Sequence, residues 1–97
     1  MTQAIYKYRI KIDGGPQHIE LPVHHRVVHV GVQNGKIYVW AEVQTDSAAC
    51  TSMFRFVVFG TGQNIKRCTE LPSETVSHLG TVQIGSDVWH VYSNANR

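Results

Sequence analysis

Hydrophobic and polar residues alternate in the first predicted element, residues 5–12, which read IYKYRIKI. Alternation with a period of two is typical of a strand that is buried on one face. One face carries Tyr6, Tyr8, Ile10 and Ile12, and the other carries Ile5, Lys7, Arg9 and Lys11. The sequence therefore predicts a strand with a basic outer face. We expect it to end at residues 13–16, because paired glycines followed by a proline cannot continue a strand.

The clearest local signal is a hairpin in the middle of the chain. Two β-rich runs, residues 26–33 and 36–44, are separated by Asn34-Gly35, and these residue types accept the positive φ angles of a type I′ turn. The face predicted to form the core combines Val28, Val30 and Val32 with Ile37, Val39, Ala41 and Val43. Tyr38 and Trp40 are then expected on the opposite face.

The strands predicted on either side of this hairpin are shorter or less regular. A short segment at residues 18–21 is interrupted by Pro22, and the small polar residues 45–52 form a connection. A further strand covers residues 53–59. Because Arg55 lies between two phenylalanines in this strand, we expect at least one of its faces to be wet.

The last part of the chain begins with a stretch that has no periodicity. Residues 60–77 predict a long loop with at most one helical turn near residues 73–76. A final hairpin joins residues 79–84 to 88–92 through a turn at 85–87. Strand-like runs without any amphipathic segment of helical length predict one all-β domain over residues 1–97, a small antiparallel β-sandwich or barrel of about six to seven strands.

Composition narrows the classes of function. The chain of 97 residues has room for one core, and its 42% hydrophobic and 16% charged residues argue against disorder. The formal net charge of +2 is too small for a dedicated binder of duplex DNA. Seven Asp and Glu residues cannot supply the dense carboxylate surface of a protein that imitates DNA.

The sequence also carries an expectation about location. Its first residues lack the basic and apolar regions of a secretory signal, and no stretch reaches the roughly 20 apolar residues that span a bilayer. We expect a cytoplasmic protein. Its two thiols, Cys50 and Cys68, are then expected to stay reduced, without a disulfide.

Six histidines raise the question of a metal site. His24, His25 and His29 are close in sequence, but residues four apart on a strand are separated by about 13 Å, which is too far for one ion. A site that joins His78 or His90 to a cysteine stays open as an alternative. The prediction is that the protein binds no metal and no cofactor.

Catalytic patterns are equally weak. Cys50 or Cys68 with a histidine and Asp46 or Asp87 would formally provide a nucleophile, a base and an orienting group, but most proteins offer such a combination. No nucleophile elbow or paired-carboxylate pattern supports it. We expect no catalytic residues.

Two features point to anionic ligands. Gly60-Thr61-Gly62 lacks the third glycine of a dinucleotide fingerprint, although its amides could form a weak anion nest near Lys66 and Arg67. A basic strand face beside exposed aromatic residues is how β-barrels hold single-stranded nucleic acid. The residues predicted for such binding are Lys7, Arg9 and Lys11, with Arg55, Lys66 and Arg67 as additions.

Several segments together resemble a family of small proteins encoded by tailed bacteriophages and prophages, known only as a domain of unknown function. They are IYKYRIKI at 5–12 with IELP at 19–22, VQNGKIYVWAEV at 32–43, FGTGQ at 59–63, HLGTVQ at 78–83 and WHVY at 89–92. Residues 22–26 and 45–52 depart from the pattern. The family has no catalytic residues to carry over. The resemblance implies a phage origin, and small phage proteins of this kind are often accessory factors that bind host machinery, including inhibitors of CRISPR–Cas.

The leading hypothesis is therefore a stoichiometric, non-enzymatic inhibitor of a bacterial host defence complex. A protein interface needs aromatic or arginine anchors, and the candidates are Tyr38, Trp40, Arg55 and Trp89. The alternatives are a module that binds single-stranded nucleic acid and a structural virion or assembly component. A small antiparallel sheet has exposed edges, so we also expect a homodimer.

Overall fold

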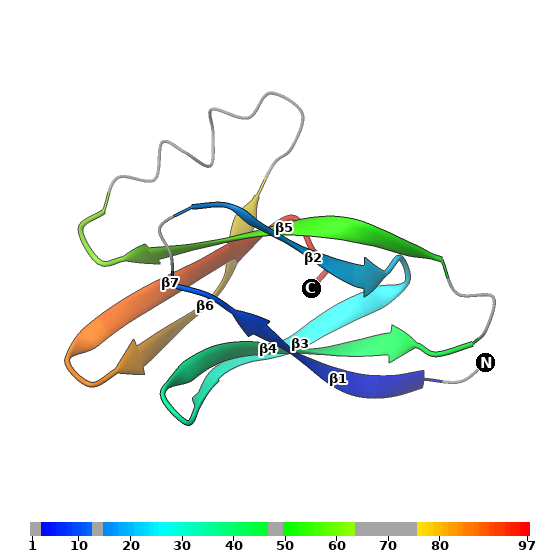
Figure 1. Cartoon of the computed structure of the whole chain (residues 1–97), viewed down its shortest axis with the longest axis horizontal. Coiled ribbons are helices and arrows are strands. Elements are labelled where there is room, and N and C mark those ends of the chain that lie inside the picture. Colours follow the sequence, from blue (N-terminus) through cyan, green and yellow to red (C-terminus); the bar gives the residue numbers. More distant parts are fainter. Residues whose placement is uncertain (1–2, 13–14, 47–49, 64–75) are drawn as a thin grey trace.

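The computed structural model describes residues 3–12, 15–46, 50–63 and 76–97, and these form two antiparallel sheets that face each other (Figure 1). The strands are β1 (Gln3–Ile10), β2 (Gln17–Pro22), β3 (His25–Gln33), β4 (Lys36–Gln44), β5 (Thr51–Gly60), β6 (Ser77–Ile84) and β7 (Asp87–Ser93). One sheet has the order β1-β4-β3 and the other β2-β5-β7-β6. The predicted all-β fold, a small antiparallel sandwich, is confirmed, and the described residues contain no helix.

The central hairpin forms as its turn residues predict. Asn34 has a φ angle of 53° and Gly35 one of 73°, so both central residues lie in the left-handed region that a type I′ turn requires. The turn pairs Gln33 with Lys36 and fixes the register between β3 and β4. The final hairpin also forms, with β6 and β7 joined by Gly85 and Ser86.

The core lies between the inner faces of the two sheets. From β4 it takes the predicted Ile37, Val39, Ala41 and Val43, all of which are buried. The opposing sheet contributes Phe56, Val58, Leu79, Val82 and Val91. Of the three valines predicted from β3, Val30 packs against this core, whereas Val32 near the hairpin tip is exposed.

The prediction that Val28 faces the core is wrong. The register shifts between Val27 and His29, so β3 contains a bulge. An extra residue in one strand reverses the alternation on one side of the bulge. Val27 is therefore buried, with 3% of its surface exposed, while Val28 is 41% exposed.

The expectation of a wet face on β5 is also wrong. Phe56 and Val58 belong to the main core, and Val57 and Phe59 form a second cluster on the other side of the strand with Val76 and Tyr92. Arg55 is only 8% exposed. β5 lies inside the four-stranded sheet, between β2 and β7, and a central strand can be covered on both faces even where its sequence contains a charged residue.

The boundaries of the other predicted elements shift by a few residues. β1 ends at Ile10, which is buried, whereas Tyr6 and Ile12 on the predicted core side are exposed. β5 begins at Thr51, inside the segment predicted as a connection. Most of the predicted loop at 60–77, with its possible helical turn, lies outside the described residues.

Candidate functional site

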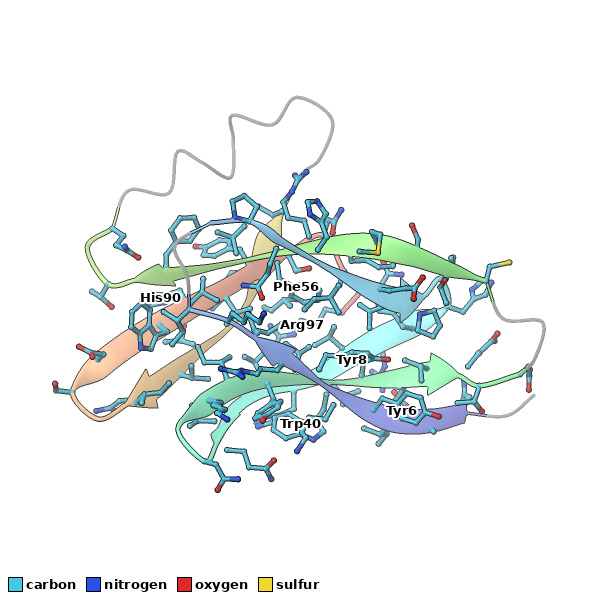
Figure 2. All side chains as sticks on the ribbon, viewed as in Figure 1. Tyr6, Tyr8, Trp40, Phe56, His90 and Arg97 are labelled. Atoms are coloured by element: carbon cyan, nitrogen blue, oxygen red, sulfur yellow. The ribbon has the colours of Figure 1, made fainter. Side chains whose placement is uncertain are left out.

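The outer face of the three-stranded sheet brings charged and aromatic side chains into rows. Residues that are opposite one another in antiparallel strands share a face. The register places Ile5, Glu42 and Arg26 in one row, Lys7, Trp40 and His29 in the next, and Arg9, Tyr38 and Gly31 in a third, with Lys36 opposite Gln33 at the end. We call these residues the basic-aromatic face. Figure 2 shows Trp40 on the side of its sheet that points away from Phe56 and the core.

Three aromatic rings form a strip across β4 and β3 on this face. The ring centroid of Trp40 lies 5.9 Å from that of Tyr38 and 5.4 Å from that of His29. Gly31 makes room for them, because a Cβ atom at this position would be 2.7 Å from His29 Nε2 and 3.3 Å from the Trp40 ring. The rings of Tyr38 and Trp40 are half-buried and therefore still partly open to a ligand.

Lys7 reaches from β1 over this strip. Its ammonium lies 4.6 Å from the centroid of the Tyr38 ring, a cation–π distance, and donates a hydrogen bond of 2.8 Å to Gln33 Oε1. The side chain thus crosses β4 diagonally toward β3. Arg9, which is opposite Tyr38, is exposed at the edge of the same row.

The charge of the basic-aromatic face is positive. Arg26 Nη2 and Nε donate to Glu42 Oε1 at 2.6 and 2.9 Å, and this exposed pair is expected to contribute about 0–1 kcal/mol to stability. Glu42 is the one acidic residue in the described rows. Its charge is offset by Arg26, so Lys7, Arg9 and Lys36 give the face its net charge.

Residues predicted for two different functions meet on this face. Tyr38 and Trp40 were candidates for protein binding, and Lys7 and Arg9 for nucleic-acid binding. Lys11 lies just beyond β1, where its backbone N–H and C=O bond to the side-chain amide of Gln17. Two independent patterns in the sequence therefore describe parts of one surface.

The remaining predicted residues lie elsewhere. Arg55 is buried in the four-stranded sheet, and Trp89 packs half-buried against the core and next to Gly60. Lys66 and Arg67 lie outside the described residues. The structure thus separates Arg55 and Trp89 from Tyr38 and Trp40.

Several members of the face were not predicted as site residues, among them Lys36, His29 and Arg26. Lys36 has the parity of Tyr38 and Trp40, so the hairpin register alone could have identified it. His29 has the outward parity in the predicted hairpin as well, although its position near His24 and His25 suggests a metal ligand first. Arg26 shares its sequence parity with Val28, and only the bulge places it on the outer face.

Two histidines on the four-stranded sheet, His78 and His90, belong to a separate hydrogen-bonded chain. His78 Nε2 lies 2.9 Å from Thr81 Oγ1, which lies 3.0 Å from His90 Nδ1, and Thr61 Oγ1 lies 2.9 Å from His90 Nε2. The described residues contain no group of three His, Cys, Asp or Glu side chains that could hold a metal ion. Cys50 is exposed and free, and Cys68 lies outside the described residues.

The surface also contains shallow clefts. One of about 380 Å³ is lined by Gly60, Thr61, Ser86, Asp87, Val88 and Trp89. Another of about 270 Å³ lies near His25 and Asn96 and borders the basic-aromatic face at Arg26 and Glu42. The first has a single carboxylate and no histidine or cysteine in its lining. Neither matches the concentration of cations and rings on the basic-aromatic face. No helix among the described residues is long and apolar enough to cross a membrane.

Comparison with known protein families matches the whole chain, residues 1–97, to a domain of unknown function, DUF7352. This agrees with the resemblance to a family of unknown function. No curated protein and no solved structure matches the chain. The comparisons therefore supply no ligand, partner or catalytic role from a relative.

Proposed function

Since the chain belongs to the DUF7352 family, whose function is unknown, we propose a function from the geometry of the surface: the protein is a non-catalytic binding protein whose basic-aromatic face holds single-stranded nucleic acid. The observation that supports this proposal is the placement of Lys7 and Arg9 directly beside Trp40 and Tyr38 in adjacent rows. Cations beside rings provide both contacts that a single strand needs. Its phosphates pair with the basic side chains, and its bases stack on the rings for about 1–3 kcal/mol each.

The size of the face favours a single strand over a protein. Three strands about 4.8 Å apart and eight residues long at about 3.3 Å per residue cover about 14 by 26 Å. This area suits an extended strand of about four nucleotides, the lower end of the range for small β-barrels. A standard protein interface takes about 800 Å² from each partner, which is more than this face offers.

The test is a binding titration of labelled oligothymidylate by fluorescence anisotropy at two salt concentrations. We expect binding that weakens as salt rises, and a Lys7→Gln/Arg9→Gln variant should reduce the slope of log K against log salt by about 1.4, since each phosphate contact on a single strand contributes about 0.7. Lys11→Gln removes a single charge beyond the rows, so it should change the slope by less than the roughly 0.7 expected for one phosphate contact. Absence of binding, or binding that does not respond to salt, would refute the proposal.

The second candidate is the inhibitor of a bacterial defence complex such as CRISPR–Cas. It is supported by two exposed apolar residues, Ile5 in the row of Glu42 and Val28 next to His29, which a nucleic acid does not need but a protein partner could cover. On this proposal the protein comes from a phage and works in the bacterial cytoplasm. Titration of a purified CRISPR–Cas effector should then abolish its cleavage at equimolar protein, and Trp40→Ala should relieve the inhibition more than Lys7→Gln/Arg9→Gln, which would mainly slow association.

A further inference from the structure

β1 differs from the other strands at the edges of the two sheets. The edges are β1 and β3 in one sheet and β2 and β6 in the other. β3 and β6 each contain a bulge and pack against one another, and β2 is short and ends at Pro22. Bulges, prolines, short length and charged side chains are the usual means by which proteins prevent edges from pairing.

Of these protections, β1 has only charged side chains, Lys7 and Arg9. Its eight residues pair with β4 without a shift in register and contain no proline or glycine. Among the described residues, β4 is its one hydrogen-bonded neighbour strand, so the backbone groups on its other side face no strand. Two large apolar side chains stand on opposite faces of this edge, Ile5 with 61% and Tyr6 with 49% of the surface exposed.

We propose that β1 pairs with β1 of a second copy, antiparallel and about a two-fold axis at Tyr6. In a two-fold antiparallel pair, the residue at the axis is opposite itself and its neighbours are opposite each other in reverse order. An axis at Tyr6 places Tyr6 against its own copy, Ile5 opposite Lys7, and Gln3 opposite Arg9. Ile5 then lies beside the base of the Lys7 side chain, whose ammonium extends the other way, over Tyr38 of its own copy.

Repulsion between basic side chains disfavours two of the neighbouring registers. An axis at Lys7 would put the two lysines opposite each other, and an axis at Tyr8 would put Lys7 opposite Arg9; like charges in such positions are destabilising. An axis at Ile5 avoids the repulsion but pairs only residues 3–7. Tyr6 gives the longest pairing, residues 3–9, that separates the basic side chains.

The pairing would join two three-stranded sheets into one of six strands. The two basic-aromatic faces then lie side by side on the same surface, with the two β1 strands in the middle. The dimer itself does not depend on the ligand. Its consequence rests on the proposed function: the dimer has two adjacent platforms of about four nucleotides each, related by the two-fold axis.

Sedimentation velocity tests the pairing. The unmodified protein should sediment as a dimer of the 10.9 kDa chain at high micromolar concentration. Ile5→Lys places a lysine opposite Lys7 of the second copy. This change should raise the dissociation constant of the dimer at least tenfold, so that the variant sediments as a monomer. Val28→Lys is the matched control, since it adds the same charge at an exposed valine on β3 and should leave the dimer intact. A monomer for the unmodified protein, or equal effects of the two changes, would overturn the proposal.

Disulfide trapping tests the register. In a background with Cys50→Ser and Cys68→Ser, Tyr6→Cys should give a covalent dimer on mild oxidation, because opposed residues lie about 4.5–5.5 Å apart between Cα atoms. Tyr8→Cys should not, since its copy would be about 13 Å away. Trapping at position 8 in preference to 6 would refute the register.

Nucleic-acid binding by a monomer would refute the dimer alone, and a dimer that binds no oligonucleotide would refute the proposed function alone.

Discussion

At the scale of single residues, the basic-aromatic face depends on the absence of a side chain at Gly31. Gly31 lies beneath the rings of His29 and Trp40, and any Cβ atom there would displace the end of the His29 ring. Because a histidine ring can rotate away, a side chain at position 31 should leave the fold intact but disturb the arrangement of the rings. Gly31 therefore matters more for the shape of the surface than for stability.

We predict that Gly31→Ala changes the surface while keeping the fold. The unfolding free energy in urea should change by less than about 1 kcal/mol, the scale of an exposed strand substitution. Affinity for oligothymidylate should fall several-fold, because His29 and Trp40 are pushed apart. Adding His29→Ala removes the obstructing ring. If Gly31→Ala costs the same affinity in that background, the steric explanation is wrong.

The partial burial of Tyr8 makes the stability of the fold depend on pH. Burial raises the pKa of Tyr8 above its ordinary value of 10.0, and repulsion from the nearby Tyr6 adds to the increase. A raised pKa in the folded state means that the unfolded chain releases its proton first, so this contribution to stability is complete below about pH 10 and is lost as the pH rises further.

We predict that Tyr8→Phe flattens the decline of stability above pH 10. The measurement is the urea midpoint at several pH values between 8 and 11, compared with the unmodified protein. Tyr6→Phe should have a smaller effect, because Tyr6 supplies only the lesser cause of the shift. An unchanged alkaline slope in Tyr8→Phe would contradict the assignment.

At the scale of elements, the sequence alone predicts the structure where a turn or an alternation of hydrophobic and polar residues determines it. Asn34 and Gly35 predicted their turn, and with it the rows that contain Trp40 and Tyr38. The bulge at Val28 could not be predicted, since Val27 and Val28 are equally apolar and only packing against the other sheet decides which of them is buried. The burial of Arg55 depends on neighbouring strands in the same way. Of the face, the sequence thus predicted Lys7, Arg9, Tyr38 and Trp40, and the other members required the register.

The turn gives a prediction at this scale. Gly35 has a φ angle of 73°, and a β-branched side chain there is strained. Gly35→Val should lower the unfolding free energy by about 1–3 kcal/mol. Gly35→Asn should cost much less, because asparagine adopts this conformation more readily. Equal losses for valine and asparagine in urea unfolding would show that the turn is not limited by its backbone angles.

At the scale of the whole molecule, the last residues join the two sheets. After β7, the buried Ala95 packs in the core, and the backbone reaches β3 of the other sheet. The Val27 N–H donates to the Asn96 carbonyl at 2.8 Å, and the Asn96 N–H donates to His25 Nε2 at 3.0 Å. His25 must therefore carry its proton on Nδ1, which donates to the Pro22 carbonyl at 2.7 Å. The Arg97 guanidinium donates to the Leu79 carbonyl.

The two hydrogen bonds made by the backbone of Asn96 can be separated from its side chain. Asn96→Ala keeps both bonds and should leave the unfolding free energy nearly unchanged. Asn96→Pro removes the N–H and leaves the buried ring nitrogen of His25 without its donor, so it should cost about 1–3 kcal/mol. In His25→Ala, where that nitrogen is already absent, Asn96→Pro should cost clearly less, and the difference measures the coupling between the tail and β3. Urea unfolding of the four variants and the unmodified protein gives each value. Equal costs of Asn96→Pro with and without His25 would show that the tail is held by Ala95 in the core rather than by this bond.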